Sequence, residues 1–230
     1  MRFALLMPAA GSGVRLGAGT PKALLEMAGV PMFVWAVRSF VAFADCVEAV
    51  IAAPPDSVNA FQERVGKFFP KTNVQVVSGG STRQQSVSLA LRELRTDCEA
   101  VAIHDAARPL VSFELIQRVL DGLTDDVAAV VPGIPVADTL KRIGGRPPSI
   151  VATIDRQDLL AIQTPQVVRR EIGVEAHRMA EETQFAATDD VALIEHFDLG
   201  ETRVVEGDPR NFKITTQEDL DRARVLLERR

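Results

Sequence analysis

Two cations, Arg15 and Lys22, project from a glycine-rich segment, residues 8–29, which reads PAAGSGVRLGAGTPKALLEMAG. The apolar residues before it predict a strand, and a strand that opens into such a turn exposes successive backbone N–H groups, which favour anions. The two cations could neutralise the charge on transferring phosphates. The segment lacks the GK[ST] ending of a P-loop, and Leu16 stands where a dinucleotide fingerprint has its third glycine. The alternative is a plain turn with solvated cations, and the preceding strand favours the phosphate interpretation.

A second glycine pair, Gly79 and Gly80, leads directly into a predicted helix in the segment SGGSTRQQSV. Glycines, together with Ser81, could let the backbone approach a base or a ribose, and Ser86 offers a hydroxyl one turn into the helix. On its own, this pattern is that of an ordinary helix N-terminus. It supports a nucleotide site only together with the first loop.

The segment VAIHDAARPLV places a carboxylate directly after an apolar strand. Magnesium prefers one or two carboxylates together with phosphate oxygens of a substrate, so Asp105 is the predicted metal ligand. We interpret His104 as a structural hydrogen-bonding residue without a catalytic role, the usual role of a lone histidine at a strand end. Arg108 either clamps a phosphate or caps the next helix, and the pattern leaves both open.

Polar residues of the second half could join this site. Lys213 lies between Phe212 and Ile214 in a predicted strand, so its side chain should point away from these two apolar residues. Pattern alone favours a solvated surface for Lys213 as well as for Arg156 and Thr164. In open α/β sheets, ligands bind beyond the carboxyl ends of the strands, where the loops after several strands meet.

The elements that must position these residues alternate between short apolar runs and amphipathic segments of helical length. This alternation is typical of repeated βαβ units and predicts an α/β fold with a mostly parallel sheet. In the predicted helix over 83–95, the apolar residues share one side and Arg83 falls on the solvated side. A terminal helix is predicted after Thr215, which forms a capping-box pattern with Glu218.

The alternation changes after Val136, where ADTLKRIGGRPPSIVATIDR reads as two extended strands joined by a turn. A hairpin that interrupts an α/β pattern usually projects from it, so residues 136–156 are predicted to form a β-arm. An arm with an apolar face favours a dimer in which each arm packs on the partner. The alternative is a hairpin folded back on its own domain. With no repeat or linker in evidence, residues 1–230 are predicted to form a single domain.

Composition excludes several classes of protein. A net charge of -5 argues against a general nucleic-acid binder, which needs a broad basic surface. Cys46 and Cys98 are far apart and have no histidine cluster near them, so neither a disulfide framework nor a zinc site is indicated. The apolar run at the N-terminus is too short for a signal peptide, and no stretch has the length of a membrane helix. We therefore expect a soluble, cytoplasmic protein with no membrane partner.

Eight motifs together resemble the 2-C-methyl-D-erythritol 4-phosphate cytidylyltransferase family of the non-mevalonate isoprenoid pathway, in the family's order and spacing: PAAGSGVRLGAGTPKAL, GGSTRQQSV, HDAARP, PVADTLKR, IDR, QTPQ, TDD and VEGDPRNFKIT. The resemblance spans nearly the whole chain. It implies a Rossmann-like nucleotidyltransferase three-layer sandwich that transfers a cytidylyl group from CTP to methylerythritol phosphate. It also implies Mg²⁺ as cofactor and a homodimer formed through the β-arm.

The resemblance implies a role for each candidate residue. Arg15 and Lys22 would stabilise the transition state, and Arg156 and Lys213 would orient the sugar phosphate. The residues that would bind CTP are Ala9, Ala10, Gly11, Ser12, Gly13, Gly79, Gly80, Ser81, Ser86 and Asp105, the last through Mg²⁺. The residues that would hold methylerythritol phosphate, some of them from the partner's arm, are Asp105, Arg108, Thr139, Arg156, Thr164 and Lys213.

One position departs from the pattern of some family members, which carry Asp where Ser81 stands, and this puts that nucleotide contact in doubt. The nearest alternative function is a cytidylyltransferase for ribitol 5-phosphate, which shares the loop, the aspartate and the arm. A non-catalytic nucleotide-binding module is an alternative of another class, because a phosphate nest binds whether or not chemistry follows. A dehydrogenase is disfavoured because the dinucleotide fingerprint fails.

Overall fold

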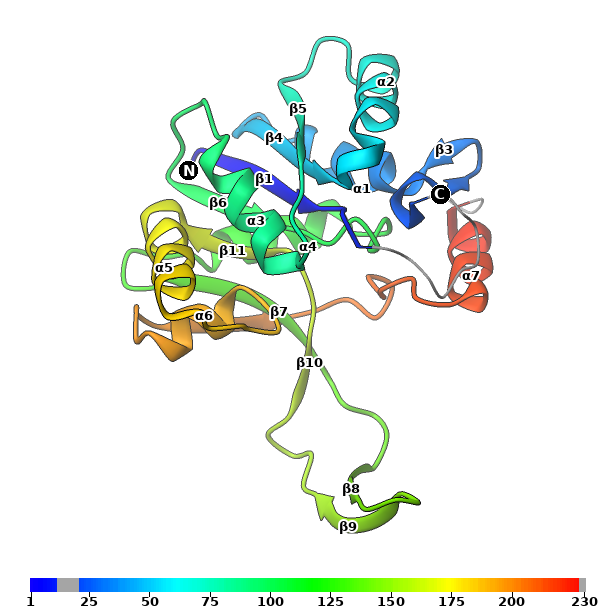
Figure 1. Cartoon of the computed structure of the whole chain (residues 1–230), viewed down its shortest axis with the longest axis vertical. Coiled ribbons are helices and arrows are strands. Elements are labelled where there is room, and N and C mark those ends of the chain that lie inside the picture. The colour runs from blue at the N-terminus through cyan, green and yellow to red at the C-terminus, as the bar shows by residue number, and fades with distance from the viewer. Residues whose placement is uncertain (12–20, 228–230) are drawn as a thin grey trace.

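A computed structural model describes residues 1–11 and 21–227 of the chain. Its centre is an eight-stranded sheet (Figure 1) in which seven strands follow the order β10-β7-β11-β6-β1-β4-β5, and β12 also pairs with β7. The strands are β1 (Phe3–Pro8), β4 (Cys46–Ala53), β5 (Val74–Ser78), β6 (Ala100–Ile103), β7 (Ala129–Pro135), β10 (Leu160–Ile162), β11 (Gln166–Arg169) and β12 (Thr202–Glu206).

The sheet is largely parallel, as predicted. β1 pairs in parallel with β4 and β6, β4 pairs in parallel with β5, and β7 with β12. Two strands are exceptions: β11 runs antiparallel between β6 and β7, and β10 pairs antiparallel with β7 at the edge. Because β1 and β6 are parallel neighbours, the loops that follow them leave the sheet at the same edge.

Helices cover both faces of this sheet, so the fold has three layers. They are α1 (Met32–Val41), α2 (Val58–Phe68), α3 (Arg83–Arg92), α4 (Phe113–Asp121), α5 (Arg170–Thr183), α6 (Val191–His196) and α7 (Gln217–Leu227), with the short 3-10 helices η2 (Lys22–Leu24) and η3 (Pro55–Ser57). Within the described part of the chain, none of these helices has the length and apolar character that a membrane crossing requires.

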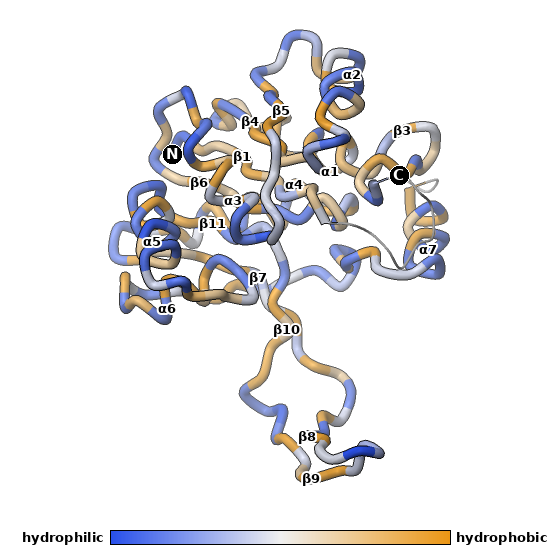
Figure 2. Tube along the Cα trace, in the orientation of Figure 1, coloured by the Kyte–Doolittle hydropathy of each residue, from blue (hydrophilic) through white to orange (hydrophobic). Residues whose placement is uncertain are grey.

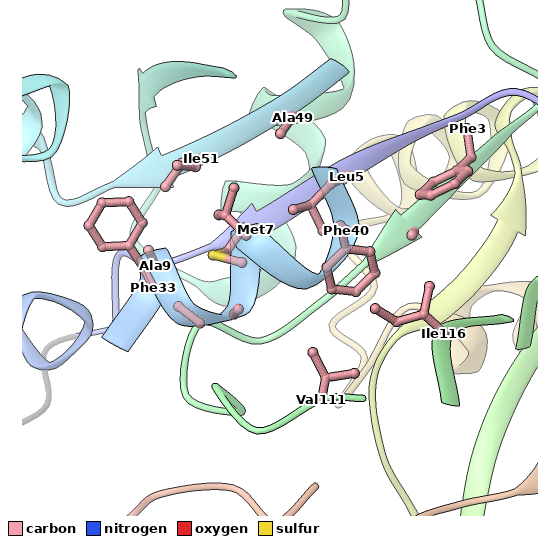
Figure 3. Packing of buried hydrophobic residues seen from close by; sticks show 14 of the residues in the cluster. Phe3, Leu5, Met7, Ala9, Phe33, Phe40, Ala49, Ile51, Val111 and Ile116 are labelled. Carbon is pink, nitrogen blue, oxygen red and sulfur yellow. The ribbon is translucent and has the colours of Figure 1, made fainter. Parts of the chain in front are cut away.

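Side chains alternate along β1 and so divide the core into two clusters. Leu5 and Met7 pack with α1, α2 and α4 on one face (Figure 3), where Phe33 and Phe40 of α1 lie against them. Ala4 and Leu6 pack with α3, α5 and α6 on the other face. Burial on both faces explains why β1 reads as a continuous apolar run. The predicted three-layer α/β sandwich is confirmed.

A third, smaller cluster joins α7 to the two-stranded sheet of β2 (Glu26–Met27) and β3 (Val30–Pro31). The capping box of α7 is shifted by one residue from the prediction, because Thr216 and Asp219 exchange the hydrogen bonds instead of Thr215 and Glu218. The backbone N–H of Thr216 donates to Oδ2 of Asp219 at 2.9 Å.

The predicted hairpin is present as β8 (Leu140–Gly144) and β9 (Ser149–Ile154), which pair only with each other among the described strands. It projects away from the central sheet (Figure 1), so the prediction of a protruding arm is confirmed over the alternative of a hairpin folded back on its own domain. Figure 2 shows hydrophobic stretches on β9 and β10. Ile143, Ile150 and Val151 of the arm are 64%, 67% and 64% exposed.

Candidate active site

A cavity of about 590 Å³ opens at the sheet edge where β1, β5 and β6 end. Three of its walls are the loops that follow these strands, and the segment before α7 closes the fourth side. The lining residues are Pro8, Ala9, Ala10, Gly11, Lys22, Ala23, Met32, Gly80, Ser81, Thr82, Arg83, Ser86, Asp105, Ala106, Ala107, Lys213 and Thr215. This is the position at which open α/β sheets bind their ligands.

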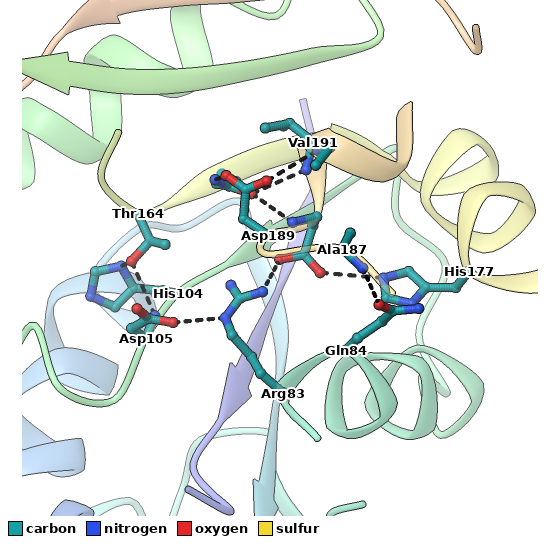
Figure 4. Close-up of polar contacts among 12 residues, drawn as sticks. Arg83, Gln84, His104, Asp105, Thr164, His177, Ala187, Asp189 and Val191 are labelled. Carbon is teal, nitrogen blue, oxygen red and sulfur yellow. Dashed lines mark hydrogen bonds and ion pairs between the residues drawn. The ribbon is translucent and has the colours of Figure 1, made fainter. Parts of the chain in front are cut away.

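The carboxylate of Asp105 is the centre of the charged groups in this cavity. Nε of Arg83 donates to its Oδ1 at 3.0 Å (Figure 4), and Nζ of Lys213 lies 2.8 Å from its Oδ2. Burial alone would raise the pKa of Asp105, but the positive charges and hydrogen bonds of Arg83 and Lys213 outweigh it and hold this pKa well below its usual value. Asp105 is therefore ionised at neutral pH.

Arg83 was predicted on the solvated side of its helix, and this prediction is wrong. Its guanidinium lies in the cavity wall, where Nη1 also donates to Oδ2 of Asp190 at 2.6 Å. Burial lowers the pKa of Arg83, but the two carboxylates outweigh it and raise this pKa above its ordinary value. A cation in the first turn of a helix opposes the helix dipole, and this unfavourable placement was the available signal that Arg83 has acidic partners.

A buried set of hydrogen bonds holds the backbone of Asp105 in place (Figure 4). The backbone N–H of Asp105 donates to Oγ1 of Thr164 at 3.1 Å, and Oγ1 lies 3.0 Å from Nδ1 of His104. Nε2 of His104 lies 3.0 Å from the carbonyl oxygen of Arg108, so it carries the proton and Nδ1 accepts from the Thr164 hydroxyl. Burial lowers the pKa of His104 to about 4. This buried neutral imidazole matches the structural interpretation of His104.

Arg108 and Thr164 do not line the cavity, although both contact Asp105. Nη1 of Arg108 donates to the backbone carbonyl of Asn211 at 2.8 Å, and its Nε lies 4.0 Å from Oδ2 of Asp105. The helix-cap alternative for Arg108 is wrong, because the hydroxyl of Ser112 caps α4. In the single chain, Arg108 therefore ties the Asp105 loop to the segment that carries Lys213.

Lys213 is not in a strand, contrary to the prediction, but its side chain does face the cavity. Its extended segment is held by the N–H of Ile214, which donates to the carbonyl of Ala107 at 2.9 Å. Nζ of Lys22, at the start of η2, donates to the carbonyl of Ile214 in the same segment. Lys22 thus contacts the loop that carries Lys213.

The loop between β5 and α3 holds the second glycine pair. Gly80 and Ser81 line the cavity, and Ser86 reaches it from α3. Oγ of Ser86 accepts from the N–H of Gly80 at 3.1 Å and donates to the carbonyl of Thr82 at 2.8 Å, so it shapes the loop. Gly79 lies behind this wall, where a Cβ atom would come within 2.7 Å of Cβ of Ala10. Only glycine lets the two loops approach this closely.

The first loop is described up to Gly11. Ala9, Ala10 and Gly11 line the cavity, and the N–H of Ala9 continues the sheet by donating to the carbonyl of Ala52 at 2.8 Å. Three of the predicted site residues, Ser12, Gly13 and Arg15, lie outside the described residues.

Thr139 and Arg156 lie on the arm and do not line this cavity. They line a second, open hollow together with Thr153, Ile154 and Asp155. The single chain therefore brings Lys22, Asp105 and Lys213 together but keeps Thr139 and Arg156 apart from them.

Magnesium was predicted at Asp105, and the donor set is compatible with it. Asp105 is the only carboxylate among the described residues that line the cavity, and no group of three His, Cys, Asp or Glu side chains within the described chain could hold a metal ion. Magnesium is usually bound by one or two carboxylates together with substrate phosphates, so an ionised Asp105 fits an ion that arrives with a nucleotide.

The chemistry of this cavity follows from its groups. Arg83 and Lys213 pair with one carboxylate at the edge of a three-layer sheet, and Lys22 lines the same cavity. No histidine or cysteine lines the described walls. Such an arrangement is suited to binding polyanions and stabilising charge. The fold and the cavity define an α/β nucleotide-binding protein of the phosphoryl-transfer type.

Comparison with known proteins identifies the family. The IspD family model, described as 2-C-methyl-D-erythritol 4-phosphate cytidylyltransferase, matches residues 3–229, and the chain belongs to this family. A relative of that name from Symbiobacterium thermophilum is 42% identical over 97% of this chain and 92% of its own length. Another, from Streptomyces coelicolor, is 40% identical over 100% of this chain and 86% of its own length. The crystal structure of 4-diphosphocytidyl-2C-methyl-D-erythritol synthase from Anaerococcus prevotii superimposes with a TM-score of 0.84 at 28% identity, covering 99% of this chain and 98% of that one.

Proposed function

We propose that this protein transfers the cytidylyl group of CTP to 2-C-methyl-D-erythritol 4-phosphate. A phosphate oxygen of the sugar phosphate attacks the α-phosphorus of CTP, the bond from this phosphorus to the bridging oxygen breaks, and pyrophosphate leaves. The products are 4-diphosphocytidyl-2-C-methyl-D-erythritol and pyrophosphate. The attacking oxygen is already ionised, so no proton has to be removed.

The observation that carries this proposal is one cavity, in a chain from this family, that holds Lys22 together with the ion pairs of Arg83 and Lys213 to Asp105. Two anionic substrates repel one another, and fixed cations and backbone N–H groups reduce that repulsion without reorganising during the reaction. Arg15 and Lys22 would stabilise the transferring phosphates, and Lys213 would help to orient the sugar phosphate. The loops after β1 and β5 would hold the nucleotide.

Asp105 would hold Mg²⁺ together with phosphate oxygens of CTP. The ion would supply neutralisation of the triphosphate charge and a better leaving group. Lys213, at 2.8 Å from Oδ2, occupies one side of this carboxylate and keeps it ionised.

We further propose that residues 1–230 form one domain and that the arm, at about residues 136–156, packs on a second copy of the chain. The exposed Ile143, Ile150 and Val151 support this proposal, because an apolar patch on a projecting hairpin is poorly covered in a monomer. In such a dimer, Thr139 and Arg156 would reach the partner's cavity and help to hold the sugar phosphate.

Pyrophosphate release tests the proposed reaction. CTP, UTP and ATP should be compared as donors, each with methylerythritol phosphate, with ribitol 5-phosphate and without acceptor. We expect the fastest release with CTP and methylerythritol phosphate. Faster release with ribitol 5-phosphate would favour the alternative sugar substrate, and CTP binding without release would indicate a non-catalytic module.

A further inference from the structure

Asp190, the second aspartate of the TDD motif, has no part in the reaction as proposed so far. It does not line the cavity, and its side chain is only 3% exposed. Burial of an ionised carboxylate is costly unless the charge is paired and hydrogen-bonded. A carboxylate kept in the interior next to the cavity therefore needs an explanation.

The guanidinium of Arg83 joins Asp190 to the cavity. Nη1 of Arg83 donates to Oδ2 of Asp190 at 2.6 Å, while Nε donates to Oδ1 of Asp105 at 3.0 Å. One planar cation thus bridges the buried carboxylate and the carboxylate that faces the ligand, as Figure 4 shows for Arg83 and Asp105. On its other side, Oδ1 of Asp190 lies 3.3 Å from Nε2 of the buried His177.

The backbone around Asp190 is held in place independently of Arg83. Oε1 of Gln166, at the start of β11, accepts from the backbone N–H groups of Asp190 and Val191 at 3.1 and 3.3 Å. Nε2 of Gln166 donates to Oδ2 of Asp189 at 2.7 Å, and Oδ1 of Asp189 accepts from the N–H of Ala192 at 3.1 Å. The backbone that carries the Asp190 side chain is therefore anchored to the sheet and to the start of α6.

Arg83 is the cation that these two carboxylates share. It pairs with both Asp105 and Asp190, whereas Lys213 and, at 4.0 Å, Arg108 lie beside Asp105. Without the charge on Asp190, Nη1 of Arg83 would lose its ion pair with this residue and keep at most a neutral hydrogen bond there. The guanidinium would then be free to change its contact with Asp105 or to turn toward an anionic ligand.

We propose that Asp190 is a positioning residue, which acts through Arg83 to fix the carboxylate of Asp105 in the cavity. This inference rests on the proposed function, because that function assigns Asp105 to the nucleotide and its metal ion. Asp190 touches neither substrate. Its effect on CTP depends entirely on the bridge made by Arg83.

A double-mutant cycle on CTP binding tests this dependence. Asp190→Asn keeps the shape of the side chain and removes its charge, and we expect CTP to bind roughly 10- to 100-fold more weakly by calorimetry, the range found for groups that orient a ligand-binding side chain. In an Arg83→Met background, the same substitution should leave the dissociation constant unchanged. The effects of two substitutions on the binding free energy do not add when the two residues act as a unit.

Thermal unfolding supplies a readout that does not involve nucleotide. Arg83→Met leaves Asp190 buried without its cation, so adding Asp190→Asn to this variant should raise the melting temperature, whereas Asp190→Asn alone should lower it. If Arg83→Met does not give folded protein, Arg83→Lys replaces it in both measurements, because one ammonium lacks the fork that bridges two carboxylates.

Glu181→Gln is the matched control, since Glu181 also joins α5 to α3 through Ser88 and Arg92 but contacts neither Asp105 nor Arg83. It should bind CTP like the wild type. The inference would be overturned by wild-type CTP binding in Asp190→Asn, or by an equal loss in the presence and absence of Arg83. If the wild-type protein bound CTP but released no pyrophosphate, the proposed function would be wrong. The comparison of CTP binding between the variants would still be valid.

Discussion

The ammonium of Lys213 lies 2.8 Å from Oδ2 of Asp105, so the segment before α7 meets the end of β6 across the cavity. Lys213 contributes to the low pKa of this carboxylate and leaves part of its own side chain exposed to a ligand. The same ammonium can thus hold Asp105 ionised and face the phosphates.

Replacing this cation is expected to reduce turnover while the fold is kept. Lys213→Met removes a preorganised charge from the cavity and should lower kcat/KM by roughly 10²-fold. The pKa of Asp105 should rise, since one of the two cations that lower it is gone. Steady-state pyrophosphate release measures the loss, and Lys71→Met, at an exposed position between α2 and β5, is the control. Normal turnover in Lys213→Met would exclude the assigned role.

Acidification is expected to destabilise the protein through His104. Its pKa is lowered by burial from 6.5 to about 4, so the unfolded chain binds this proton more tightly than the folded one. The stability that the neutral imidazole contributes is present above pH 6.5 and lost as the pH falls to about 4.

The variant His104→Asn cannot take up this proton. Urea denaturation between pH 7 and pH 4 should show the difference in unfolding free energy between wild type and variant shrinking by about 3 kcal/mol. A difference that stays constant over this range would contradict the buried neutral imidazole.

The close approach of the two glycine-containing loops should make Gly79 sensitive to a single methyl group. In Gly79→Ala the new Cβ would lie 2.7 Å from Cβ of Ala10 and 3.1 Å from the carbonyl oxygen of Ala53. We expect a loss of about 1–3 kcal/mol in unfolding free energy and weaker CTP binding. Gly66→Ala is the control, because no atom lies within 4 Å of its new Cβ in α2, so it should stabilise the helix slightly. Equal melting temperatures for the two variants would be inconsistent with the crowding at Gly79.

Subunit complementation tests whether the arm serves the partner's cavity. Lys22→Ala and Arg156→Ala should each be nearly inactive alone. If each site combines the cavity of one copy with the arm of the other, a mixed dimer of the two variants has one intact site. Equal mixing and refolding should then restore about a quarter of wild-type activity. A mixture no more active than its components would show that Arg156 does not act across the dimer.

Much of the fold could be predicted from the sequence, because alternating apolar runs reflect burial of β1 and its neighbours on both faces. The cavity loops were predictable for the same reason, since ligands bind where parallel strands end, and Asp105 follows β6 directly. The arm was recognisable as two extended segments around a turn, and β8 and β9 pair as expected.

Contacts between segments far apart in the chain were not predictable in the same way. Helical periodicity assigned Arg83 to solvent, because periodicity shows only which side of a helix a residue lies on. It does not show which segments pack against the end of the helix. Lys213 was expected in a strand, but a hydrogen bond from Ile214 to Ala107 holds its segment instead. Asp190 and Gln166 lie in the motifs TDD and QTPQ but were given no role, because their roles depend on three segments meeting in space.

The central claim is that transfer occurs directly between the two substrates, with the protein supplying charge and no nucleophile. One diastereomer of CTP that carries sulfur on the α-phosphorus, reacted with methylerythritol phosphate, tests it most directly. A single in-line displacement predicts inverted configuration at this phosphorus in the product. Retained configuration would require a covalent nucleotidyl-protein intermediate and would contradict the account.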